Sequence, residues 1–145
     1  RGFYNLLVQK RANDREIEEH QFALNQHAIV TVTNVNSEII YVNSKLEAIS
    51  GYRSNELLGK HHKLLYSKEY EQDAIDKMYH ELSLGNVWRS EVVNQTKSGE
   101  SYWLDTSVVP FVKENGDIYQ YISISTDITE QKETEQALLN EKQRM

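Results

Sequence analysis

The stretch VWRSEVVNQTKSGESYWLDTSVVPFVKENGDIYQYISIS, residues 87–125, decides the fold of this 145-residue chain. It contains three runs rich in β-branched and aromatic residues, at 87–95, 101–112 and 117–125. The sequences between them, Lys-Ser-Gly at 97–99 and Asn-Gly at 115–116, are typical of tight turns, and Asn-Gly is a strong hairpin signal. The three runs therefore predict an antiparallel meander.

Before this stretch, two shorter β-branched runs at 27–34 and 38–43 flank turn-forming residues and predict a first hairpin. Short helices are expected at 44–50 and 54–60. A longer helix is expected at 69–85, where Ala74, Met78 and Leu82 recur every four residues. His80 lies on the opposite side of that helix, toward solvent.

Both ends of the chain are expected to be helical. Sparse apolar residues at helical spacing predict an N-terminal helix, and Asp127 with Glu130 three residues later predicts the start of a polar C-terminal helix. The layout is α+β, with a five-stranded antiparallel sheet and helices over one face. We expect an N-terminal extension at 1–22, a domain at 23–128 and a connector helix at 129–145.

Composition excludes several classes of protein. The chain has no cysteine, a net charge of -6 and no apolar run of membrane-spanning length, so thiol chemistry, nucleic-acid binding and membrane insertion of this segment are not expected. No nucleophile-elbow, phosphate-loop or zinc-protease motif occurs, so neither an enzyme nor a metal site is expected. We expect a cytoplasmic protein, or the cytoplasmic part of a membrane-anchored receptor.

Three passages carry a resemblance to a known family: YVNSKLEAISGYRSNELLGK at 41–60, VWRSEVVNQTKSGESYW at 87–103, and STDITEQK at 125–132. In order and spacing they resemble the PAS domains of bacterial sensor kinases, diguanylate cyclases and chemoreceptors. The resemblance implies a sheet whose concave face, closed by helices, holds a small ligand. It also implies that the domain senses or relays a signal through its terminal helices to a covalently linked output domain.

NQTKSGESYW at 94–103 is similar to the matching passage of flavin-binding PAS domains, including the LOV photoreceptors. This likeness implies that Asn94 bonds a flavin ring, and Trp88 matches redox-sensing members that bind FAD. His62 stands where LOV domains have their photoactive cysteine, which rules out the light-driven adduct, and His61 stands where they have asparagine. Leu104 and Ser125 stand where those flavin-binding domains have two further polar residues that contact the flavin.

Two alternatives to FAD stay open. Heme would need an axial histidine, which His61 or His62 could supply from the loop. With no ligand at all, the core would be filled by the protein's own side chains. The residues expected around the pocket, whatever it holds, are Trp88, Asn94, His61, His62, Met78, Leu82, Leu104 and Ser125.

The opposite face of the sheet is also expected to be apolar. If Leu104 faces the pocket, then Trp103, Val109 and Phe111 face outward, with isoleucines of the last strand beside them. An apolar patch of this size is rarely left in water, so we expect the N-terminal helix and a second copy of the chain to cover it. This predicts a homodimer. The leading mechanism is that a change in the redox state or occupancy of a pocket ligand shifts residues 127–129, where the last strand joins the C-terminal helix. The alternative is a ligand-free PAS domain that acts as a dimerising spacer.

Overall fold

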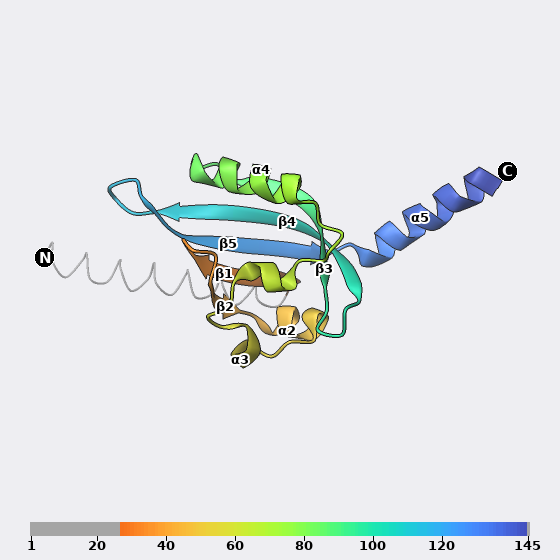
Figure 1. Cartoon of the computed structure of the whole chain (residues 1–145), viewed down its shortest axis with the longest axis horizontal. Helices are drawn as coiled ribbons and strands as arrows, with labels where there is room; N and C mark the ends of the chain where they lie inside the picture. Colours follow the sequence, from red (N-terminus) through yellow and green to blue (C-terminus); the bar gives the residue numbers. More distant parts are fainter. Residues whose placement is uncertain (1–26, 145) are drawn as a thin grey trace, which may run out of the picture.

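The computed structural model describes residues 27–144, which form one five-stranded antiparallel sheet and the helices around it (Figure 1). The strands are ordered β2-β1-β5-β4-β3. The first and last strands of the chain, β1 and β5, therefore pair with each other inside the sheet. The predicted hairpin and meander are confirmed. Their bounds are β1 (Ile29–Asn34), β2 (Ile39–Val42), β3 (Trp88–Gln95), β4 (Ser101–Val112) and β5 (Ile118–Asp127).

The turn of the first hairpin is held by a side chain. Asn34 Oδ1 accepts hydrogen bonds from the backbone N–H groups of Asn36 and Glu38, at 2.9 and 3.0 Å. Ser37 adopts a left-handed conformation with φ of 62°, which few residues other than glycine adopt. The asparagine bonds offset part of that strain, so the turn forms without a glycine.

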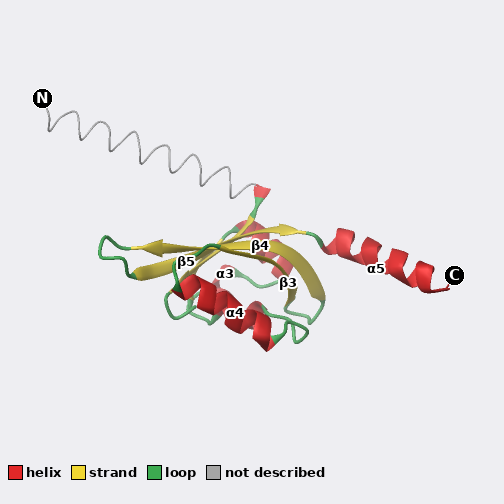
Figure 2. Cartoon of the chain, turned by 90° about the horizontal axis from the view of Figure 1, so that it is seen from above, coloured by secondary structure: helices red, strands yellow, loops and turns green. Residues whose placement is uncertain are grey.

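Four helical elements between β2 and β3 cover one face of the sheet (Figures 1 and 2). Their apolar residues form two separate buried clusters. The larger joins α2 and the preceding strands to Val92 and Leu104, whereas the smaller consists of Met78 and Leu82 of the last helix against Val108. The elements are α2 (Ser44–Ser50), α3 (Ser54–Leu57), the 3-10 helix η1 (His62–Leu65) and α4 (Gln72–Ser83).

Strand β4 shows the alternation that the sequence predicts. Tyr102, Leu104, Thr106 and Val108 are buried on the helix-covered side. The residues expected on the outer face are half-buried or exposed, and none of them is buried. They are Trp103, Val109, Phe111, Ile118, Ile122 and Ile124.

Helix α5 (Thr129–Arg144) follows β5 after a single residue and projects away from the sheet (Figures 1 and 2). None of its residues is buried. Its start is held by Asp127, whose Oδ1 accepts from the Thr129 N–H at 3.0 Å and the Thr129 hydroxyl at 2.6 Å. The expected segment 1–22 lies outside the described residues, and no described helix is long and apolar enough to cross a membrane.

Candidate functional site: an inner cavity connected to the exit helix

A small cavity lies between the sheet and the wall made by η1, the following loop and α4. Its volume is about 30 Å³, and a second hollow of about 20 Å³ continues from it beneath α4. Since a water molecule needs roughly 10–15 Å³ of such space, the first hollow has room for about two waters. Both hollows are lined by His62, Tyr66, Met78, Val108 and Ser123.

The structure brings most of the expected pocket residues to these hollows. The first is lined by Trp88, Asn94, His62, Met78, Leu104 and Ser125, and Leu82 borders the second. Trp88, Val92 and Asn94 reach the first hollow together because side chains two apart on β3 share a face. Their role toward a ligand stays a prediction.

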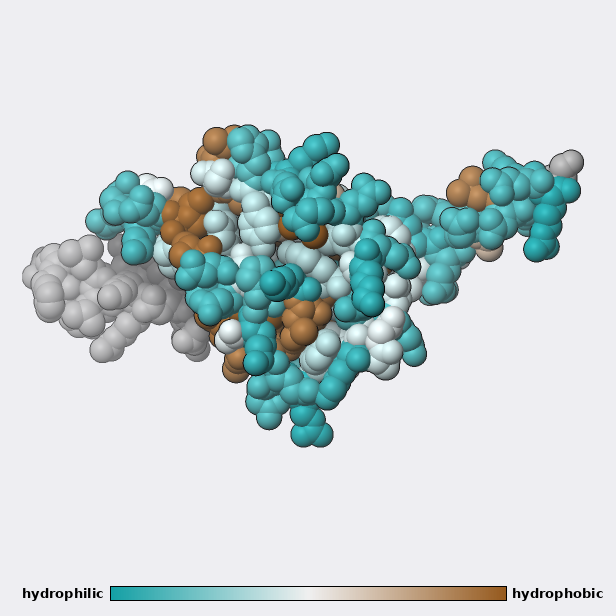
Figure 3. All heavy atoms as spheres, viewed as in Figure 1, coloured by the Kyte–Doolittle hydropathy of each residue, from teal (hydrophilic) through white to brown (hydrophobic). Residues whose placement is uncertain are grey.

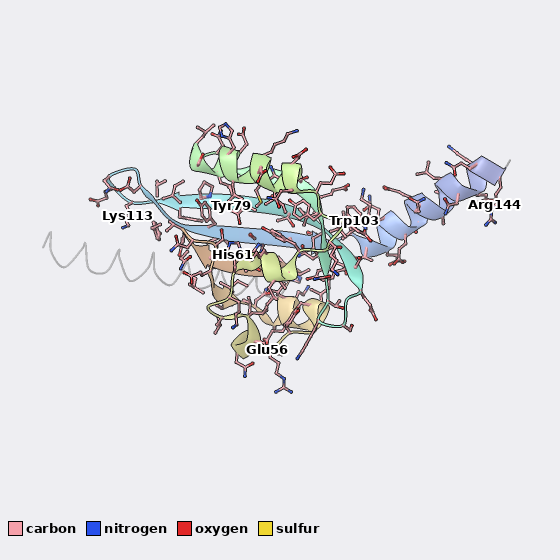
Figure 4. The ribbon with its side chains drawn as sticks, viewed as in Figure 1. Glu56, His61, Tyr79, Trp103, Lys113 and Arg144 are labelled. Atoms are coloured by element: carbon pink, nitrogen blue, oxygen red, sulfur yellow. The ribbon has the colours of Figure 1, made fainter. Side chains whose placement is uncertain are left out.

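His61 is the exception, and the expectation that it faces the pocket is corrected. Its side chain is exposed, and its Nδ1 accepts the Lys63 N–H at 3.1 Å, capping η1 (Figure 4). As the residue before the 3-10 helix, it has extended backbone angles. Among the described histidines, only His62 reaches the cavity.

His62 sits inside a group of tyrosines. Its Nδ1 lies 3.1 Å from the Tyr66 hydroxyl, and the two rings meet edge to face. Burial, and then the neighbouring His61, lower the pKa of His62 to about 4, so the ring is neutral at neutral pH. Burial likewise raises the pKa of Tyr66, and that of Tyr70 to about 12, so both phenols keep their protons.

Polar atoms of the sheet also border the cavity. The hydroxyls of Thr106 and Ser125, which are register partners on β4 and β5, lie 2.8 Å apart. Asn94 Oδ1 and the Tyr70 hydroxyl are buried with no hydrogen-bond partner among the described residues. Sequence reasoning missed both tyrosines, and neither carries a motif. Tyr66 lies in a segment without helical or strand periodicity, and Tyr70 lies in the part of the expected helix 69–85 that precedes the start of α4 at Gln72.

The start of α5 is bonded to the same strands. The Ile128 N–H donates to the Trp103 carbonyl at 2.9 Å, and the Trp103 N–H donates to Thr129 Oγ1 at 2.9 Å. Lys132 forms an ion pair with Glu91 at 2.5 Å and lies over the Trp103 ring. The helix is therefore attached to β3 and β4 at the residues next to those that line the cavity (Figure 4).

Flavin and heme can be tested against these residues. The unpaired Asn94 Oδ1, the neutral hydroxyls and the Trp88 ring fit the polar edge and the flat body of a flavin. The volume does not fit a ring system, whose pockets measure roughly 300 Å³ or more, unless the α4 wall moves outward. Heme fits less well, since it requires still more space, although His62 borders the cavity as a possible axial ligand.

The model of one family, described as PAS domain, matches residues 26–130 of this chain. This protein belongs to the PAS domain family. The fold agrees, since the PAS domain superimposes with a TM-score of 0.70 on a solved structure described as an RNA-binding light-oxygen-voltage receptor. That match is at 22% identity and covers 78% of this chain and 33% of the other.

Curated relatives of this PAS domain are signalling proteins. It is 32% identical over 104 residues to the aerotaxis receptor of Escherichia coli, and 27% identical over 111 residues to a nitrogen fixation regulatory protein of Klebsiella oxytoca. These alignments cover 72% and 77% of this chain but only 20% and 22% of the relatives. The chain thus spans about a fifth of their length, and its role is that of a signal-sensing module.

Proposed function

We propose that this PAS domain senses the state of a ligand in its inner cavity and relays it through the exit helix α5. The observation that carries the proposal is the short path between the two. Ser125 borders the cavity and bonds Thr106, and only two residues later Asp127 holds the first turn of α5. A change of hydrogen bonding at Ser125 therefore acts on the strand end from which α5 starts.

FAD is the ligand that we propose. Asn94 would bond the polar edge of the flavin ring, and Trp88, Met78 and Leu104 would contact its faces. A bound flavin supplies redox chemistry that changes its own protonation and hydrogen bonding. To admit it, α4 moves outward; this helix packs through the smaller buried cluster, so the larger core around α2 is left intact.

The visible absorption spectrum of the purified protein tests this proposal. We expect flavin absorption in the wild type and a clearly smaller amount of bound flavin in Asn94→Leu, because leucine fills the same space without the amide. Asn55→Leu, at an exposed position of α3, is the matched control and should keep the colour. A colourless wild-type protein that takes up no added FAD would rule the flavin out.

A second candidate is a ligand-free spacer that dimerises. The observation that favours it is the size of the cavity, which at about 30 Å³ has room for only about two waters. In that case the outer face of the sheet, together with segment 1–22, holds two copies together. The wild type would then be colourless, and the relay would depend on the arrangement of the two α5 helices.

We further infer that the domain is one module of a longer bacterial signalling protein in the cytoplasm. The output domain would be covalently linked beyond α5, as in a sensor kinase, a diguanylate cyclase or a chemoreceptor. The support is the small share of the curated relatives that the chain spans. Fusing α5 in frame to a histidine kinase core, and measuring phosphorylation with the cavity intact and with Asn94→Leu, tests the direction of relay.

A further inference from the structure

Two buried polar atoms border the first hollow without a partner among the described residues: Asn94 Oδ1 on β3, and the Tyr70 hydroxyl on the loop before α4. Buried polar groups in folded proteins are nearly always hydrogen-bonded. The Tyr102 hydroxyl has no partner at strict hydrogen-bond geometry either, but it does not border the hollow. It lies beside Asn94, its register partner on β3, whose side chain acts on it as a donor and partly offsets the rise of the Tyr102 pKa on burial, so Asn94 Oδ1 is still without a donor. Two unsatisfied groups from separate elements at one cavity indicate an occupant that bonds both.

The hydrogen-bonding chemistry of these two side chains defines which groups the ligand must offer them. An amide oxygen only accepts, so Asn94 Oδ1 needs a donor. A phenol hydroxyl donates readily, and burial raises the pKa of Tyr70 to about 12, so it keeps the proton that it donates. The pair therefore fits a ligand edge on which an N–H group stands beside a carbonyl, as in a cyclic imide or ureide.

The lack of charged residues around the cavity restricts the class of ligand further. Neither hollow has an aspartate, glutamate, lysine or arginine among its lining residues, and the one imidazole there, His62, is neutral. A charged group buried in this lining would have no counter-charge, which is strongly unfavourable. Any charged part of the ligand must stay outside.

We propose that Tyr70 is a specificity-determining residue that acts with Asn94 to select an uncharged edge carrying one donor and one acceptor. The proposal rests on the proposed function, since it names the second contact to the same ligand. Tyr70 also lies two residues before α4, so its bond connects the ligand to the wall that must move.

Lumiflavin, which carries an imide N–H between two carbonyls and no phosphate, is the probe for titrations followed by fluorescence. We expect Tyr70→Phe and Asn94→Leu each to weaken its binding about tenfold, the effect of losing one good hydrogen bond. Tyr119→Phe, at an exposed tyrosine of β5, is the matched control and should bind like the wild type. 3-Methyllumiflavin should bind the wild type weakly, and lumiflavin-3-acetate, which adds a carboxylate, more weakly still.

A second measurement does not depend on the ligand. Urea unfolding of the ligand-free protein should show Tyr70→Phe to be as stable as the wild type or more so, because its hydroxyl has no partner to lose. A less stable Tyr70→Phe protein would mean that the hydroxyl is already bonded within the protein, and would overturn the proposal.

The outcomes separate the two proposals. Lumiflavin binding that is equal in the wild type and Tyr70→Phe overturns the role of Tyr70 and leaves the flavin proposal standing. Equal binding of 3-methyllumiflavin and lumiflavin-3-acetate overturns the selection against charge. No binding of lumiflavin or FAD to the wild type overturns the flavin proposal, and the donor-acceptor pair with it.

Discussion

Asn43 shows how one side chain can join three parts of the fold. Its Oδ1 accepts from the N–H groups of Leu46, in the first turn of α2, and of Val30, on β1, both at 3.1 Å. Its Nδ2 donates to the Ala28 carbonyl at 2.7 Å. A serine hydroxyl has a single proton and a shorter reach, so only an asparagine at this position can make all three bonds.

His62 makes the stability of the protein depend on pH. Its folded-state pKa of about 4 lies below the ordinary value of 6.5, so below pH 6.5 the unfolded chain binds a proton that the folded protein refuses. Stability is therefore complete above pH 6.5 and falls as the pH drops toward 4. Between pH 7 and 5 we expect a loss of about 2 kcal/mol in the free energy of unfolding.

Urea unfolding at a series of pH values checks this expectation. His62→Gln should remove most of the slope between pH 7 and 5, whatever its own stability, whereas His80→Gln, at an exposed position of α4, should keep it. The salt-bridged carboxyls Glu56 and Asp105, whose pKa values are lowered, act only at lower pH. An unchanged slope in His62→Gln would show that another group is responsible.

Helix α5 is an element whose position depends on a few polar bonds, because it has no buried residue. Its apolar side chains, Leu138 and Leu139, lie exposed toward its far end (Figure 3). What holds its first turn is the set of bonds from Thr129 and Ile128 to Trp103, with Lys132 over the indole ring. An element held in this way can be reoriented by a small change at the strand end.

Thr129→Val should loosen this attachment while keeping the shape of the side chain. The variant loses the hydroxyl bonds to Trp103 and Asp127, of which each contributes about 1 kcal/mol. We expect amide hydrogen exchange over residues 129–135 to become faster by roughly fivefold or more, with little change in β1 or β2. Thr134→Val, on the exposed side of the same helix, is the control. Equal exchange in both variants would place the attachment elsewhere.

Both faces of the sheet are apolar, and we expect them to have different functions. The helix-covered side contains the cavity, and the outer side presents half-buried or exposed apolar residues of β4 and β5. Soluble monomers rarely leave a contiguous apolar patch of this kind in water. We therefore expect the full chain to be a homodimer that uses this outer side.

Light scattering before and after removal of residues 1–22 measures the molar mass and so tests for the dimer. The full chain should have twice the monomer mass, and the shortened chain should dissociate, or become more prone to aggregate, as the patch is uncovered. Replacing Ile122 with glutamate in the full chain should weaken the dimer, because a charge on the patch opposes its burial. A monomeric mass in all three proteins would end the dimer proposal.

The sequence by itself determined the strands, the helices, their order and the family, since turn residues and side-chain periodicity act over a few neighbouring positions. The expectation that Trp88, Asn94 and Ser125 lie at the pocket came from the resemblance to flavin-binding PAS domains. Only the tertiary structure decided that His62 and not His61 enters the cavity, that Tyr66 and Tyr70 border it, and that the hollow is small. Those features depend on how the segment 61–71 packs against strands that are distant from it in the sequence.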